Sequence, residues 1–314
     1  MFDIIGKRYY YFALSLLFII PGLVAMVYST IQFGTPVRLS IDFTGGALLE
    51  LQFEKPVLPE KVHLAFVDEG FFDTTVQTTD ERTVVVRSKP LTMEVKDRIE
   101  EKLEEDFGSI TELRFDSVGP AIGHEVTSAA ALAVIAASLL ILFFIIFAFR
   151  KVPNAFRYGV CAISAMVHNV LIAGGLFSLA GIFLGWEADS LFLTALLTVI
   201  GFSVQDAIVV FDRIRENTPK RRGEPFETIV NRSLLETLHR SLATQLNAIF
   251  VLIAILLFGG ATIKQFVIIL IIGFIGGTYS SICNAVPLLV VWEKGEIGAF
   301  FQRLFGKKEA RAPA

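Results

Sequence analysis

The stretch Val199–Asn217, with the sequence VIGFSVQDAIVVFDRIREN, begins inside a long apolar run and ends among charged residues. Asp206 lies in its apolar part, because residues 191–205 carry no charge and Ala207–Phe211 are apolar. An isolated carboxylate is expensive in hydrocarbon, so a carboxyl group here is either neutral or paired. The stretch therefore predicts a membrane-spanning helix that carries a functional acidic group.

The helical period places several other residues on the face of Asp206, whereas Asp212 points elsewhere. That face holds Val199, Ser203, Val210 and Arg213. The alternative interpretation is that the helix ends early and that Asp206 already lies among the cytoplasmic lipid headgroups. Ionisable groups inside a membrane span are functional by default, which favours the first interpretation.

The composition predicts a polytopic membrane protein with one soluble insertion. The 314 residues are 54% hydrophobic, with a mean hydropathy of +0.62 and a formal net charge of −3. The chain is not basic overall, so its charge does not indicate nucleic acid as a partner. The segment Gly34–Glu125 is acidic, with 19 acidic and ten basic residues. Cys161 and Cys283 lie singly in apolar segments, so we interpret them as packing residues and expect no metal site.

The first apolar run, Tyr11–Tyr28, is long enough to cross the roughly 30 Å of bilayer hydrocarbon. A cleaved signal peptide is the alternative, but the run is longer than a signal-peptide core and no clear cleavage site follows. Lys7 and Arg8 precede the run, so the positive-inside rule predicts a cytoplasmic N-terminus. We expect residues 1–33 to hold this terminus and the first span.

Residues 34–125 predict an extracytoplasmic α+β domain of the ferredoxin-like type, with the element order βαββαβ. The first strand region comprises Arg38–Phe43 and Ala47–Phe53, which we expect to be extended on either side of Thr44-Gly45-Gly46. The other expected strands are Thr74–Thr79, Thr83–Ser88 and Thr111–Val118, and the expected helices are Pro59–Glu69 and Thr92–Phe107. The fold alone does not identify a function.

The sequence of residues 126–292 predicts five further spans, which gives six in all. Residues 293–314 are expected to form a cytoplasmic tail. The five further spans are Val126–Phe149, Tyr158–Leu184, Leu191–Phe211, Ser241–Gly260 and Phe266–Trp292. Between the third and fourth of these, residues 212–240 predict a basic cytoplasmic loop. Its apolar residues at helical spacing, from Phe226 to Leu238, predict an amphipathic helix on the inner membrane surface. All the predicted inner segments are basic, including the loop at Pro153, so both termini are expected inside.

Small residues on two of these spans predict close packing with neighbouring helices. They are Ala129, Ala133 and Ala137 in one span and Gly273 and Gly277 in another. Six spans with one acidic group do not make a complete transporter. We therefore expect a second six-span half, related by pseudo-twofold symmetry, to supply the helices that pack on these small-residue faces and on the polar groups of the fourth and fifth spans.

Polar residues of the fifth span form a candidate partner for Asp206. Arg240, Thr244 and Asn247 share one helix face, and Gln245 lies beside them. Arg240 begins its span at the inner end, near the depth of Asp206. If the two meet, Arg240 stabilises the Asp206 anion while burial favours the neutral acid, which makes a proton-binding site. Polar residues of other spans, His168, Asn169 and Asn284, are interpreted mainly as helix–helix hydrogen-bonding groups.

Four motifs resemble those of the SecF proteins, a branch of the SecD/SecF family in the bacterial Sec machinery. They are VIGFSVQDAIVVFDRIREN, TLHRSLATQLNA at Thr237–Ala248, IDFTGG at Ile41–Gly46 and VGPAIGHE at Val118–Glu125. The resemblance covers nearly the whole chain. It implies a non-enzymatic, cofactor-free membrane protein of the resistance–nodulation–division (RND) superfamily of proton-driven transporters. It also implies that SecD is an obligate partner and that the chain contacts the SecYEG channel, translocating preproteins and membrane lipids. The implied location is the bacterial inner membrane.

The resemblance also assigns residues. The family's intramembrane aspartate falls on Asp206 and its partner arginine on Arg240. Gln205, Ser203, Thr244 and Asn247, which lie near these two by helical spacing, are expected to be supporting polar groups. Gln205 stands where the family usually has asparagine, which changes the hydrogen bonding beside the acid. The family motifs further contain Asp42, Gly45 and Gly46, and Asp212 and Arg213 at the cytoplasmic edge of the helix.

Two other functions remain open from the residues. Another proton-driven RND half-transporter, for lipids or small molecules, shares the buried acid. An intramembrane aspartyl protease needs two facing aspartates, and only Asp206 lies deep in a span. The sequence contains no GxxxxGK[ST] phosphate-binding loop, which argues against ATP as the energy source. The coupling ion is expected to be a proton, with sodium as the alternative.

Overall fold

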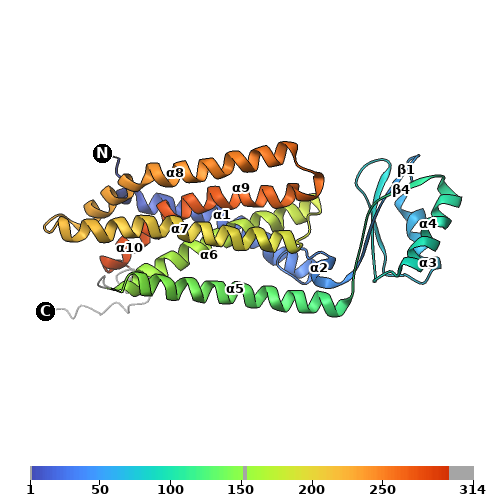
Figure 1. Ribbon diagram of the computed structural model, residues 1–314, viewed down its shortest axis with the longest axis horizontal. Helices are drawn as coiled ribbons and strands as arrows, with labels where there is room; N and C mark the ends of the chain where they lie inside the picture. Colours follow the sequence, from blue (N-terminus) through green and yellow to red (C-terminus); the bar gives the residue numbers. More distant parts are fainter. Residues whose placement is uncertain (1, 151–153, 297–314) are drawn as a thin grey trace, which may run out of the picture. The chain divides into compact units, whose positions relative to one another are not determined.

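The computed structural model describes residues 2–150 and 154–296 (Figure 1). Part of the loop expected at Pro153 and most of the expected tail lie outside these residues. The chain divides into two compact units. We call Leu39–Ala133 with Glu187–Ser190 the sheet unit, and Met1–Arg38, Val134–Trp186 and Leu191–Ala314 the helical unit.

The sheet unit has the predicted ferredoxin-like order. Its four strands are β1 (Gly46–Phe53), β2 (Thr75–Thr78), β3 (Thr83–Ser88) and β4 (Ile110–Val118). They pair antiparallel in the order β2-β3-β1-β4. Helices α3 (Pro59–Asp68) and α4 (Met93–Phe107) connect β1 to β2 and β3 to β4. The prediction of a βαββαβ domain is confirmed.

Alternation along β1 explains how this sheet packs. Ala47, Leu49, Leu51 and Phe53 are buried, whereas the residues between them are more exposed. Successive side chains of a strand point to opposite faces, so one face of the sheet is apolar. Helices α3 and α4 cover it with Val62, Ala65, Phe66, Ile99 and Leu103, all of which are buried.

One predicted extended segment is a helix instead. Ile41–Thr44 forms the short helix α2, so the expectation of an extended Arg38–Phe43 is wrong at its end. Ser40 caps this turn, because its Oγ accepts a hydrogen bond from the backbone N–H of Asp42. Gly45 and Gly46 then follow with φ of +72° and +127°, which redirects the chain into β1.

Among the described residues, six helices are long and apolar enough to span a membrane, as predicted. They are α1 (Arg8–Phe33), α5 (Pro120–Ala148), α6 (Ala155–Leu184), α7 (Ser190–Lys220), α8 (Phe226–Phe258) and the continuous run of α9 (Ala261–Ser280), the π-helical turn η2 (Ser281–Ala285) and α10 (Val286–Glu293). A short 3₁₀ turn, η1 (Ile5–Lys7), precedes α1. The chain is a multi-pass membrane protein.

The expected loop at residues 212–240 is mostly helical. Helix α7 continues to Lys220 and α8 begins at Phe226, so only a short link separates them. Ile229, Val230 and Leu234 are buried in the helical unit. The predicted amphipathic helix is therefore the first part of α8, and its apolar face packs inside the protein rather than on the membrane surface. Periodicity gives the apolar face of a helix but not what covers it.

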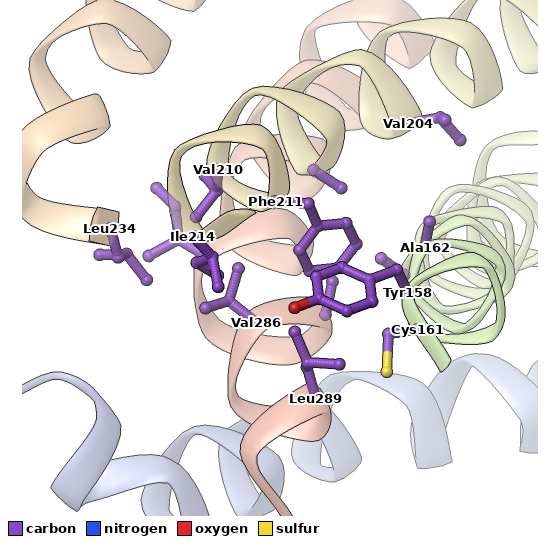
Figure 2. Close-up of a cluster of buried hydrophobic side chains, with 14 of the residues drawn as sticks. Tyr158, Cys161, Ala162, Val204, Val210, Phe211, Ile214, Leu234, Val286 and Leu289 are labelled. Carbon is purple, nitrogen blue, oxygen red and sulfur yellow. The ribbon is translucent and has the colours of Figure 1, made fainter. Parts of the chain in front are cut away.

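The hydrophobic core of the helical unit joins helices that are far apart in the sequence (Figure 2). Tyr158 of α6 stacks on Phe149, and both contact Phe211 of α7 edge to face. Val286 and Leu289 of α10 and Leu234 of α8 complete the cluster. Cys161 is buried in it without a disulfide, in agreement with a packing role.

Helices α1 and α6 approach each other closely at two glycines. A Cβ atom added to Gly175 would lie 2.6 Å from the Cα of Gly22. A Cβ added to the neighbouring Gly174 would lie 3.8 Å from its nearest atom, the Cε of Met26, which is ordinary contact. Small residues at such crossings allow backbones to touch.

We therefore predict that Gly175→Ala destabilises the helical unit and that Gly174→Ala does not. The first substitution forces two backbones apart, at a cost of about 1–3 kcal/mol. Thermal unfolding of the full chain in detergent measures the difference. Equal unfolding temperatures for the two variants would contradict the close approach.

The turn between β2 and β3 depends on Asp80. Its Oδ1 accepts hydrogen bonds from the backbone N–H groups of Arg82 at 2.7 Å and Thr83 at 2.9 Å. The bond from Arg82 is the main reason that the pKa of Asp80 lies below its usual range. A lowered folded-state pKa adds stability at neutral pH, and this contribution is lost as the pH falls through that pKa.

We predict that Asp80→Ala lowers the unfolding temperature at pH 7 and that the difference from wild type shrinks below about pH 4, where the carboxyl group protonates. Asp80→Asn keeps an acceptor oxygen and should lie between the two at pH 7. Unfolding of the three full-length chains across this pH range tests the expectation. A difference that stays constant with pH would show that the charge of Asp80 does not matter.

Candidate functional site

Asp206 is buried within the helical unit, on the side of α7 that faces α8. Its side chain is 5% exposed. The Nε2 of Gln245, on α8, donates a hydrogen bond of 2.7 Å to Oδ2 of Asp206. Gln245 is itself buried, and its Oε1 has no hydrogen-bond partner among the described residues. A single neutral donor therefore joins the buried acid to the neighbouring helix.

Sequence reasoning did not select Gln245 as the partner, although a signal was available. Thr237, Ser241 and Gln245 recur every four residues on α8, and all three are buried. Residues at this spacing share one helix face. The face that we selected, with Arg240, Thr244 and Asn247, is exposed in the structure. Both faces are polar in sequence, so only the packing distinguishes the buried one.

The structure does not bring Arg240 to Asp206. Within the described residues, the guanidinium group of Arg240 forms no ion pair or hydrogen bond with any side chain. It lines two adjoining hollows instead, of about 540 Å³ and 280 Å³. The larger one lies between α5, α7 and α8 and is also lined by Gln205, which is exposed.

Ser203 lies one turn before Asp206 and connects α7 to α9. Its Oγ is 3.3 Å from Oγ of Ser280, and both side chains are buried. A Cβ added to Gly273 would lie 2.0 Å from Cγ2 of Val199. The glycine face of α9 is therefore covered by α7 of the same chain, so our expectation that Gly273 and Gly277 await a partner's helix is wrong.

The polar residues of α6 contribute to helix packing. The Nδ2 of Asn169 donates a 3.1 Å hydrogen bond to the carbonyl oxygen of Gly273 on α9. His168 is buried and stacks on Tyr279, with ring centroids 5.9 Å apart. Asn284 is half-buried in the π-helical turn.

The charged end of α7 is fixed to α8 by a polar cluster. Arg213 Nε donates to Glu236 Oε2 at 2.6 Å, and Asn217 Nδ2 donates to the same oxygen at 2.9 Å. Arg213 also pairs with Glu216, and Asp212 pairs with Arg215. Asp212, Arg213, Glu216 and Glu236 line the smaller hollow next to Arg240.

Asp42 has a structural partner within the sheet unit. Its Oδ2 accepts hydrogen bonds from the backbone N–H of Ser190 at 2.9 Å and from its hydroxyl group at 2.7 Å. Ser190 is the first residue of α7, and a carboxylate at a helix N-terminus is favourable. Gly45 and Gly46 follow on the turn that leads into β1.

Comparison with known proteins identifies the family. Residues 98–295 match the family described as "Protein export membrane protein SecD/SecF, C-terminal", and residues 31–57 match the "SecD/SecF GG Motif". The chain belongs to the SecD/SecF family. The second match contains Asp42, Gly45 and Gly46, and the first contains Asp206 and Gln245.

Relatives within the SecD/SecF family include both separate and fused proteins. A protein translocase subunit SecF of Anaerolinea thermophila is 50% identical over 99% of this chain and 100% of its own length. A protein translocase subunit SecDF of Thermus thermophilus is 34% identical over 93% of this chain and 38% of its own length. The crystal structure of SecDF from Thermus, described as a translocon-associated membrane protein, superposes with a TM-score of 0.77 at 34% identity, covering 93% of this chain and 39% of that one.

We predict that Gln245→Met destabilises the chain by about 1–3 kcal/mol, because it leaves the buried Asp206 carboxyl group without its donor. Methionine has nearly the same length, so the change removes hydrogen bonding more than volume. Thr244→Val on the exposed face is the control, with an expected change within about 0.5 kcal/mol. Thermal unfolding in detergent compares them. A larger loss of stability from Thr244→Val than from Gln245→Met would show that the face with Gln245 is not the buried one.

Proposed function

We propose that this chain is an accessory subunit of the Sec protein translocase. It pairs with SecD and uses the proton-motive force to drive or complete the export of preproteins through SecYEG. It lies in the bacterial inner membrane with both termini in the cytoplasm and the sheet unit outside. Membership of the SecD/SecF family supports the role in protein export. The relatives are named protein translocase subunits, which supports the assignment to the translocase.

The burial of Asp206 carries the proposal for proton coupling. The carboxyl group lies in an apolar part of α7 and has one neutral hydrogen-bond donor, Gln245. Such a group gains or loses a proton when its access to water changes, because its charged form needs water or a cation. Moving one charge across 100 mV supplies about 2.3 kcal/mol, which is enough to bias a change between two conformations.

Gln245 and Arg240 have complementary roles in this proposal. An amide donor satisfies either the neutral or the charged carboxyl group, so Gln245 holds Asp206 without fixing its charge. Arg240 is a cation on the same helix and needs a movement of α8 to reach Asp206. An approach of Arg240 would favour the anion and so promote proton release. Gln205, Ser203, Thr244 and Asn247 surround these groups as supporting polar residues.

A second six-span half is expected to complete the transporter. Ala129 and Ala133 on α5 are exposed, so the small-residue face of this helix still has room for a neighbour. In the Thermus SecDF relative, the matching region is only 38% of one longer polypeptide. We infer that SecD is a separate protein that packs beside this chain and supplies the second six-span half.

The test is export of a secreted reporter into membrane vesicles that contain this chain and SecD. Wild type and Asp206→Asn are compared with and without a proton gradient. Asparagine keeps the shape of the side chain and removes the titrating group. We expect the gradient to stimulate export several-fold in wild type and not in the variant.

Three other outcomes are informative. A variant that responds like wild type would show that Asp206 is structural. A response to a sodium gradient alone would keep the proposed subunit and change the coupling ion. Export that is independent of this chain, with gradient-driven movement of a lipid or small molecule, would favour the other RND transporter class.

A further inference from the structure

Two family motifs, Ile41–Gly46 and Val118–Glu125, contribute no residue to the buried acid site, but they meet in the sheet unit. A Cβ atom added to Gly45 would lie 2.8 Å from the Cα of Pro120. One added to Gly123 would lie 2.7 Å from the backbone nitrogen of Gly45. The backbones approach too closely for a side chain at either position, so the glycines let α2 pack directly on the first turn of α5.

The same short helix is joined to α7 through Asp42. Its Oδ2 accepts hydrogen bonds from the backbone N–H and the hydroxyl group of Ser190, at 2.9 and 2.7 Å, and Ser190 is the first residue of α7. The backbone N–H of Ser40 also donates a 2.8 Å hydrogen bond to the carbonyl oxygen of Ala188, in the loop before α7. The segment around α2 therefore contacts the first turn of α5 and the first residue of α7.

An ion pair with β3 holds the loop before α7. The Nη2 of Arg87 lies 2.9 Å from Oε2 of Glu187. Glu187 precedes α7 by three residues, so the backbone between them can absorb a small displacement of the helix. The carboxylate of Asp42 binds α7 itself, and its two charge-assisted hydrogen bonds to one residue constrain both distance and direction.

Helices α5 and α7 begin in the sheet unit and continue into the helical unit, which α5 enters at Val134 and α7 at Leu191. Asp206 follows Ser190 by 16 residues, which is about 24 Å along the helix at 1.5 Å per residue. No proline lies between them, and a sharp helix kink needs proline or a similar break. A displacement of α7 at Asp206 is therefore carried to Ser190.

We propose that Asp42 passes a movement of α7 to the sheet unit, while Gly45 and Gly123 hold the same segment on α5. Asp42 is a positioning residue, because it acts on the sheet through α2 and does not touch the acid. The displacement then reaches β1, which follows Gly45 and lies between β3 and β4 in the sheet. The proposal rests on the proposed function in one respect, since a change in the charge of Asp206 supplies the movement.

Vesicles that contain this chain and SecD allow two quantities to be measured for each variant. These are proton movement, with a pH-sensitive dye, and the stimulation of reporter export by a proton gradient. We expect Asp42→Ala to keep proton movement within about twofold of wild type, because the acid site stays intact, and to lose most of the stimulation. Asp42→Asn keeps an acceptor oxygen and should retain part of the stimulation.

Thr44→Val is the matched control, because it removes hydroxyl hydrogen bonds made within the α2 segment and leaves the contact with α7 in place. It should keep both quantities. Loss of both in Asp42→Ala would show that Asp42 only holds the fold. Retention of both would show that α7 moves the sheet unit by another path. Either result would overturn the proposal.

Amide hydrogen exchange of the full chain with SecD tests the same link without a gradient. Gln245→Met loosens α7 at Asp206, and we expect it to raise exchange several-fold in Ile41–Phe53 of an otherwise wild-type chain. It should have no such effect when combined with Asp42→Ala. An equal rise in both backgrounds, or none in either, would contradict the role of Asp42. If wild type moves no protons but shows this difference, the proton-coupling function fails and the role of Asp42 stands.

Discussion

The hydrogen bond between Asp206 and Gln245 is the constraint on which the arrangement of the helical unit depends. A carboxyl group buried between two membrane helices needs a partner, and here it comes from the adjacent helix rather than from water. Helices α7 and α8 must therefore keep the rotation that turns these two side chains toward each other. The same rotation turns Arg240 outward, because residues five apart lie about 140° apart around a helix.

The rest of the helical unit supports this rotation at several depths. At the charged end, Arg213 and Asn217 of α7 share the carboxylate of Glu236 on α8. Toward the middle, Ser203 contacts Ser280, and Gly273 leaves space for Val199. Backbone contact and polar pairing thus fix α7 on two sides, against α8 and α9. The proton-driven change in α7 that we propose would have to break or shift this small set of contacts.

Sequence alone predicted the elements that follow from local periodicity. Thr83–Ser88 was predicted as a strand with the same bounds as β3, and the long apolar runs predicted the six spans. The short helix at Ile41–Thr44 was missed because it depends on a local cap at Ser40. Gln245 was missed because two polar faces of α8 look equivalent until packing buries one of them. The cytoplasmic placement of the termini and the domain bounds remain predictions, since they depend on a membrane.

The separation of Asp206 from Arg240 has an electrostatic consequence. A permanent ion pair would hold the carboxylate charged and would oppose proton binding. In the proposed coupling, a neutral amide as the resting partner would leave the carboxyl group free to bind a proton, while Arg240, at the charged end of α7, would remain where its charge costs little.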